Sequence, residues 1–203
     1  EWGRRVGVDN FYTYIDKIGL TSKTGIDIAG EAGTIIHKKE NVGEVELATM
    51  SFGQSFQITP MQMLRAAAAI VNGGNLVTPH FAIKTCAADK TTYSEFSYST
   101  TQEAVSKETS DTMKDILRQV VEEGGGKKAY IEGFSIGGKT ATSQKLPRGS
   151  GKYIASFIGF SDVTDPSVIA MCLIDEPQGV YYGGTIAAPV IRELYDNILP
   201  YMD

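Results

Sequence analysis

Residues 137–143 read Gly-Gly-Lys-Thr-Ala-Thr-Ser, and this stretch decides the interpretation of the whole chain. Apolar residues alternate with smaller ones just before it, and the hydroxyls of Thr140 and Thr142 recur at period two. That period predicts a β-strand on which the two threonines share one face. Lys139 lies beside them and can reach over the end of the strand. One ammonium, two hydroxyls and small residues that permit close approach suit a ligand with a carboxylate.

A second pattern covers part of the same stretch. Residues 133–140 match G-x-x-x-x-G-K-[ST], the pattern of a phosphate-binding P-loop. A P-loop needs a buried strand before it and a helix that starts at the lysine. Residues 127–132 are too charged for a central parallel strand, and residues 141–151 contain a proline and two glycines without a helical period. A nucleotide-binding loop is therefore a remote alternative. Without its flanking segments, the K-T-x-T tetrapeptide itself favours an ordinary edge strand with an exposed lysine.

The composition limits the class of protein. The chain has 203 residues, of which 42% are hydrophobic and 21% charged, and its net charge is −5. These values predict one globular domain, or most of one, with a core that needs no crosslinks. No basic stripe indicates nucleic-acid binding. No apolar run approaches a membrane span, no signal peptide opens the chain, and the missing initiator Met indicates a fragment or a processed chain.

The cysteines and histidines give little chemical signal. Cys86 and Cys172 lie far apart without a C-x-x-C motif, so they neither require nor exclude a disulfide. Small buried hydrophobes are the favoured interpretation of both cysteines. His37 and His80 have no partner at metal-ligand spacing. We therefore expect neither a metal nor a cofactor.

Helices are expected in five regions. Asp9 is expected to cap the first, which Gly19 ends. Thr59 and Gln62 form a capping box around a proline at the first helical position of the third. The alanine-rich stretch 66–69 in that helix predicts close packing against a neighbour. The expected helices span about residues 9–18, 44–50, 59–71, 106–123 (or from 110) and 189–198.

Strands are expected mainly in the last third. Residues 153–160 alternate well, residues 167–174 are continuously apolar, and a turn joins them into a hairpin. The strand that contains Lys139 is expected to be the third member. Residues 79–86 predict a further strand with Phe81 and Ile83 on one side, while residues 94–101 have no clear period. Residues 24–31 and 176–185 are expected to be loops, and the acidic residues of the first to be solvated.

Short segments in one order along the chain point to a known family. They include Lys23-Thr24-Gly25-Ile26-Asp27, Ser51-Phe52-Gly53-Gln54, Thr59-Pro60-Met61-Gln62, Gly138-Lys139-Thr140, Ala155-Ser156-Phe157-Ile158-Gly159-Phe160 and Tyr182-Gly183-Gly184. In these segments the chain resembles the second half of a class B penicillin-binding protein transpeptidase domain. The resemblance implies an α+β fold, with an antiparallel sheet packed by helices as in serine β-lactamases. Residues 1–203 would be the C-terminal part of a single domain.

The resemblance also implies a function. A transpeptidase of this family uses a serine to attack a stem peptide that ends in D-Ala–D-Ala, and passes the acyl group to an amine on a neighbouring stem. This reaction crosslinks peptidoglycan, and β-lactam antibiotics acylate the same serine. The implied partners are stem peptides, β-lactams and the missing N-terminal half of the domain, without nucleic acid. The implied location is the outer face of the bacterial cytoplasmic membrane.

The resemblance assigns roles to three residues. Lys139 would bind the substrate carboxylate and hydrogen-bond the serine of the second motif. The hydroxyls of Thr140 and Thr142 would hold the carboxylate of substrate or drug, and the backbone N–H of Thr142 would be half of the oxyanion hole. Ala141 stands where the family usually has glycine, which affects substrate fit and β-lactam affinity. Ser55 also replaces a usual glycine, which we interpret as a local packing change.

Two of the three family motifs are missing from this chain. No serine is followed by a lysine three residues later, and none by an asparagine two residues later. The S-x-x-K and S-x-N motifs lie upstream in the family, so we expect this chain alone to be inactive. The alternative is a non-catalytic module that senses penicillin or stem peptides, an interpretation that Ala141 keeps open.

Overall fold

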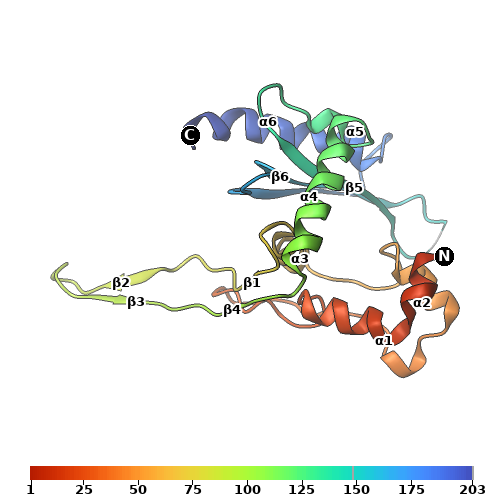
Figure 1. The fold of residues 1–203 in the computed structure, drawn as a ribbon, viewed down its shortest axis with the longest axis horizontal. Helices are drawn as coiled ribbons and strands as arrows, with labels where there is room; N and C mark the ends of the chain where they lie inside the picture. The colour runs from red at the N-terminus through yellow and green to blue at the C-terminus, as the bar shows by residue number, and fades with distance from the viewer. Residues whose placement is uncertain (148, 203) are drawn as a thin grey trace. The chain divides into compact units, whose positions relative to one another are not determined.

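The computed structural model describes residues 1–147 and 149–202. The chain forms two compact units, Glu1–Lys107 and Glu108–Asp203 (Figure 1). Over the described residues, no helix combines the length and the apolar character that crossing a membrane requires.

The first helix is longer than its sequence pattern predicts. Helix α1 spans Trp2–Lys17 and contains a kink at Gly7, whose φ of 76° and ψ of 161° are not helical. The predicted start at Asp9 therefore corresponds only to the segment after the kink. The carboxylate of Asp9 forms an ion pair with Lys39 at 2.8 Å, in the short 3₁₀ helix η1 (Lys39–Asn41).

Helices α2 (Glu44–Met50) and α3 (Pro60–Val71) confirm their predicted positions. The backbone N–H of Gln62 donates to Thr59 Oγ1 at 3.1 Å, and the N–H of Thr59 donates to Gln62 Oε1 at 2.8 Å. This is the predicted capping box. Ala66 and Ala69 are buried, and they belong to two small clusters with neighbours such as Ile15 and Leu76. The alanines thus allow the close packing that the sequence indicates.

Ser55 differs from its predicted role. Its φ is 66°, in the left-handed region that favours glycine. A change from glycine at this position therefore acts on backbone conformation rather than on packing. The hydroxyls of Ser55 and Thr49 lie 3.0 Å apart and form a hydrogen bond that stabilises the turn.

A two-stranded arm replaces the strand predicted at residues 79–86. Strand β2 (Lys84–Cys86) pairs with β3 (Tyr93–Glu95), and β1 (Leu76–Val77) pairs with β4 (Thr100–Thr101) at the base. The β2–β3 hairpin extends away from the rest of its unit (Figure 1). Its side chains have no second layer to pack against. Phe81 and Ile83 are therefore exposed, and the prediction that Cys86 is buried is wrong.

Asp27 and Glu31 in the 24–31 loop are exposed and half-buried, respectively, in keeping with the expected solvated turn residues, and both also accept hydrogen bonds. The Asp27 carboxylate accepts hydrogen bonds from the backbone N–H groups of Ala82 at 2.8 Å and Phe81 at 2.9 Å. These bonds hold the pKa of Asp27 below its usual value. Glu31 accepts from the backbone and hydroxyl of Thr24, both at 2.6 Å. Asp27 thus fixes the loop to residues 81–82, while Glu31 joins the two ends of the loop.

The second unit contains the predicted three-stranded antiparallel sheet. Strands β5 (Ile136–Gln144), β6 (Tyr153–Ser161) and β7 (Ile169–Asp175) lie in the order β5-β6-β7. The register pairs Thr140 with Phe157, and Phe157 with Cys172. The strand that contains Lys139 is therefore the third member of the sheet, as the alternation predicts.

Helices cover this sheet and complete the second core. They are α4 (Lys107–Glu122), the 3₁₀ helix η2 (Lys127–Ala129), α5 (Gly183–Ile186), α6 (Ala188–Ile198) and the 3₁₀ helix η3 (Leu199–Tyr201). Val121, Phe157 and Ile191 are fully or almost fully buried between sheet and helices. Tyr195 is also buried, and its hydroxyl donates to the Gly159 carbonyl at 2.7 Å. The end of the loop predicted at 176–185 is the helical turn α5.

Candidate active site

One edge of β5 presents backbone groups without a partner strand. The N–H of Lys145 donates to the carbonyl of Lys152 at 2.9 Å, in the same register as the β5–β6 ladder. Hydrogen-bonded positions alternate in an antiparallel pair. Ala141 lies an even number of residues before Lys145, so its backbone also bonds β6. The backbone groups of Thr140 and Thr142 point away from β6. In the described part of the chain no strand pairs with that side of β5, so the Thr142 N–H is available as a donor.

The side chains of Thr140 and Thr142 meet helix α5, as their shared face predicts. Thr142 Oγ1 accepts a hydrogen bond from the backbone N–H of Gly183 at 3.2 Å. Thr140 lies against Gly184, where an added Cβ would come within 3.1 Å of the threonine Cγ2. Because the Thr142 oxygen already accepts one hydrogen bond, its own proton can be donated to a ligand.

A cavity of about 420 Å³ opens beside these threonines. Its volume lies within the usual range for small-molecule sites. It brings the middle of β5 together with η2, the start of α5 and the loops next to them. The lining residues are Gly125, Lys127, Lys128, Thr140, Ala141, Thr142, Tyr182, Gly183, Gly184 and Thr185.

Lys139 does not line this cavity. Its side chain is exposed, and its Nζ donates to the Thr140 carbonyl at 2.7 Å, a carbonyl that faces the unpaired edge of β5. The cations at the cavity are Lys127 and Lys128 instead. The predicted role of Lys139 with a substrate carboxylate stays a prediction. Strand β5 also continues through Lys139 to Gln144, so the helix that a P-loop requires at this lysine is not formed.

Two glycines bring α5 close to the sheet. A Cβ on Gly183 would lie 2.1 Å from the Ser156 carbonyl oxygen and 2.3 Å from that of Ala141. A Cβ on Gly184 would lie 2.3 Å from the Gly125 carbonyl oxygen. Only glycine fits at such distances. No local sequence pattern gives Lys127 or Lys128 a role at this site, whereas the Gly-Gly pair after Tyr182 is a signal for the close approach of α5.

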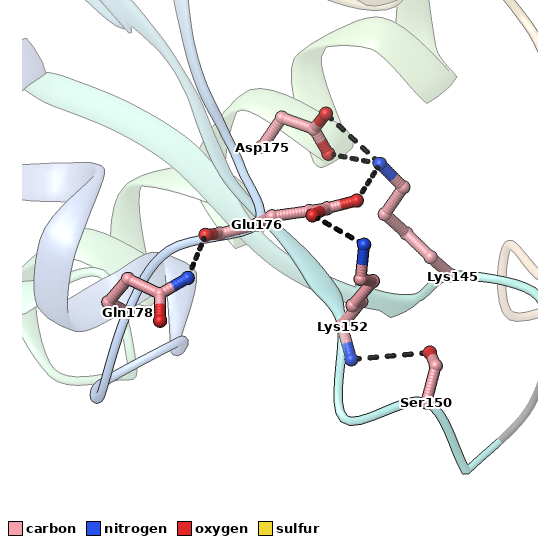
Figure 2. A network of polar contacts seen from close by, with 6 residues as sticks. All are labelled: Lys145, Ser150, Lys152, Asp175, Glu176 and Gln178. Atoms are coloured by element: carbon pink, nitrogen blue, oxygen red, sulfur yellow. Dashed lines mark hydrogen bonds and ion pairs between the residues drawn. The ribbon is translucent and has the colours of Figure 1, made fainter.

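A network of charges connects the ends of the three strands (Figure 2). Lys145 Nζ donates to Asp175 at 2.9 Å and to Glu176 at 2.8 Å, and Lys152 pairs with Glu176 at 2.9 Å. The hydrogen bond from Lys145, followed by that from Lys152, holds the pKa of Glu176 below its usual value. Tyr153 stacks on Tyr181 with ring centroids 4.0 Å apart. These contacts join the strand of Thr142 to the loop that leads to Gly183.

Comparison with known proteins identifies the family to which this fold and strand belong. The model of the penicillin binding protein transpeptidase domain matches residues 1–196. The chain belongs to this family. Over 98% of its length it is 40% identical to the stage V sporulation protein D of Bacillus subtilis. Over 90% it is 30% identical to the peptidoglycan D,D-transpeptidase FtsI of Buchnera aphidicola. The chain spans about a third of each relative, 32% of the length in both cases.

Solved structures of the family share the fold. Penicillin-binding protein 3 of Mycobacterium tuberculosis, solved in complex with ampicillin, superposes with a TM-score of 0.88 at 26% identity. The match covers 98% of this chain and 47% of that one. The transpeptidase domain of penicillin-binding protein 3 from Burkholderia pseudomallei has a TM-score of 0.84 at 24% identity. The α+β fold predicted from the sequence is thus confirmed.

Proposed function

We propose that this chain is part of a serine D,D-transpeptidase that crosslinks peptidoglycan stem peptides and is acylated by β-lactams. The observation that carries the proposal is the unpaired edge of β5, where the Thr142 N–H is free to donate beside a cavity lined by Thr140 and Thr142. An N–H directed into a cleft can stabilise the oxyanion of an acyl-transfer intermediate. The family match and the names of the relatives support this assignment.

Each site residue has a distinct role in this proposal. The Thr142 N–H is one oxyanion donor, and the hydroxyls of Thr140 and Thr142 bind the terminal carboxylate of the peptide or drug. Lys139 adds positive charge at the edge of β5, where its flexible stem can leave the Thr140 carbonyl and reach the carboxylate and the second-motif serine. Ala141 adds a methyl group on the strand between the two threonines.

The nucleophile is supplied from outside this chain. We infer that residues 1–203 are the C-terminal part of one transpeptidase domain, because the family match runs through both compact units. The N-terminal half would bring the S-x-x-K and S-x-N motifs that these residues lack. By analogy with cell-wall enzymes of this kind, we place the parent protein at the outer face of the cytoplasmic membrane.

Labelling with a fluorescent penicillin tests the proposal. We expect a protein that joins this chain to its N-terminal half to label covalently, and to release D-alanine from a peptide that ends in D-Ala–D-Ala. The 203-residue chain alone is the control and is expected to remain unlabelled. A joined protein that carries the serine yet neither labels nor turns over the peptide would contradict the proposal. Labelling without turnover would favour the alternative, a penicillin-sensing module.

A further inference from the structure

The cavity beside β5 has an unusual charge for this protein. The chain as a whole carries a net charge of −5, yet the two charged residues that line the cavity are both lysines, Lys127 and Lys128. They follow one another in the 3₁₀ helix η2, whose Ala129 is buried and anchors the segment in the core. The two ammonium groups therefore start from a backbone that the core holds in position.

Neither lysine is paired with a carboxylate of the described residues. Within residues 1–147 and 149–202, no carboxylate forms an ion pair or hydrogen bond with the side chain of Lys127 or Lys128. Glu122, in the preceding helix α4, pairs with Arg118 at 2.6 Å. Two unpaired cations side by side repel one another, and an anionic ligand removes this repulsion.

We propose that Lys127 and Lys128 select peptides that carry a second negative charge, besides the terminal carboxylate that the threonines hold. This inference rests on the proposed function, because it concerns the same cavity. The hydroxyls of Thr140 and Thr142 can bind only one carboxylate at the edge of β5. A cavity of about 420 Å³ accommodates more than a terminal residue. The ligand class is thus a D-Ala–D-Ala peptide with an acidic side chain in the preceding residue.

The residues around the two lysines favour an extended polar ligand. The nearest atom to an added Cβ on Gly125 is Thr140 Oγ1 at 3.9 Å, so this glycine leaves the backbone open to close approach at the cavity. The Tyr182 side chain is exposed and adds an aromatic surface at the cavity, where its ring also contacts Tyr181 with centroids 4.7 Å apart. The lysines therefore supply charge, while the neighbouring backbone and tyrosine supply contacts that do not depend on charge.

Two matched peptides test the inference. Acetyl-Glu-D-Ala-D-Ala and acetyl-Gln-D-Ala-D-Ala differ only in one charge. Each is used to compete with fluorescent penicillin for the protein that joins this chain to its N-terminal half. We expect the Glu peptide to bind more tightly, by about 2- to 5-fold for each lysine that it meets. Raising the ionic strength from about 0.1 M to about 1 M should abolish the preference, because the Debye length falls to about 3 Å.

Variants separate the role of the cavity from that of overall charge. Lys127→Gln/Lys128→Gln is expected to bind both peptides equally. Lys127→Glu leaves one lysine beside one glutamate at the cavity, and it should likewise abolish the preference. The control is Lys38→Gln/Lys90→Gln, which removes the same charge from two exposed lysines of the first unit and should leave the preference unchanged. Circular dichroism checks that each variant is folded.

The outcomes separate this inference from the proposed function. Equal binding of the two peptides to the wild-type protein, with penicillin labelling intact, overturns the inference alone. A preference that survives in Lys127→Gln/Lys128→Gln also overturns it. Absence of both labelling and competition by either peptide overturns the proposed function. A preference for the Glu peptide that is lost in the double variant and kept in the control supports the inference.

Discussion

At the scale of single residues, Gly183 determines how closely α5 approaches the sheet. An added Cβ would lie 2.1 Å and 2.3 Å from two carbonyl oxygens of β6 and β5. Both contacts are with backbone, which cannot rotate away. We predict that Gly183→Ala destabilises the protein by about 1–3 kcal/mol or more through overpacking. Denaturant unfolding measures this change.

Gly33→Ala is the matched control for that substitution. Nothing lies within 4 Å of the position where its Cβ would be, and its φ is outside the left-handed region. We expect this change to be neutral or slightly stabilising, because alanine reduces the entropy of the unfolded chain. Equal stabilities for the two variants would show that the approach of α5 is looser than described.

A second prediction at this scale concerns the hydroxyl of Thr142. Thr142→Val keeps the β-branched shape but leaves the Gly183 N–H without its acceptor and removes the donor to the ligand carboxylate. We expect acylation by penicillin to slow by about 10-fold in the protein that includes the N-terminal half. Thr142→Ser keeps the hydroxyl and should stay within about 3-fold. If valine and serine behave alike, the hydroxyl takes no part in binding the carboxylate.

At the scale of elements, the start of α3 depends on the capping box. Thr59 and Gln62 exchange two hydrogen bonds, and Gln62 is fully buried. We predict that Thr59→Ala lowers the free energy of unfolding by about 0.5–2 kcal/mol. Thr59→Ser retains the accepting oxygen and is expected to lose less than half as much. Thermal or denaturant unfolding of both variants makes the comparison, and a neutral Thr59→Ala would contradict the capping assignment.

The ends of β5, β6 and β7 depend on the charges in Figure 2. The pKa of Glu176 is lowered in the folded state by Lys145 and Lys152, from an ordinary value of 4.5. A lowered pKa means that the stabilisation is present above pH 4.5 and is lost as the pH falls through the folded-state value. We predict that Glu176→Gln makes the melting temperature less dependent on pH below 4.5. Melting curves from pH 7 to pH 3 measure this, and parallel curves for variant and wild type would contradict it.

At the scale of the whole molecule, the three-stranded sheet exposes strand edges. Within the described ranges, neither β5 nor β7 pairs on its outer side. Leu173, on the edge strand β7, is also 43% exposed. Unpaired apolar edges favour association between chains. We predict that the isolated chain self-associates as its concentration rises, and that Leu173→Lys reduces this association.

Leu146→Lys is the control for the edge prediction. Leu146 is more exposed than Leu173, at 74%, but it lies in the loop after β5 and outside the three strands. Adding the same charge there should change self-association less than Leu173→Lys does. Sedimentation equilibrium over a range of concentrations measures both variants. A monomeric wild-type chain at all concentrations would rule out the proposed edge pairing.

The features that the sequence predicted correctly rest on signals within a few residues. The alternation in β5 and β6 predicts their strands, and the Thr59–Gln62 spacing predicts a cap, because both depend on local backbone geometry. The arm at residues 79–101 could not be predicted in this way. Apolar side chains such as Phe81 usually indicate burial, yet a two-stranded hairpin has no second layer to bury them.

By itself, the sequence determined the family, the antiparallel sheet of three strands that includes the strand of Lys139, and the position of Thr140 and Thr142 on one face of β5. Only the tertiary structure decided which charges line the cavity beside those threonines. Lys127 and Lys128 reach the cavity through the turn of η2, while Lys139 bonds the Thr140 carbonyl. Local periodicity shows which face of a strand a side chain occupies. Which segment packs against that face depends on contacts between residues far apart in the chain, and short-range patterns do not contain them.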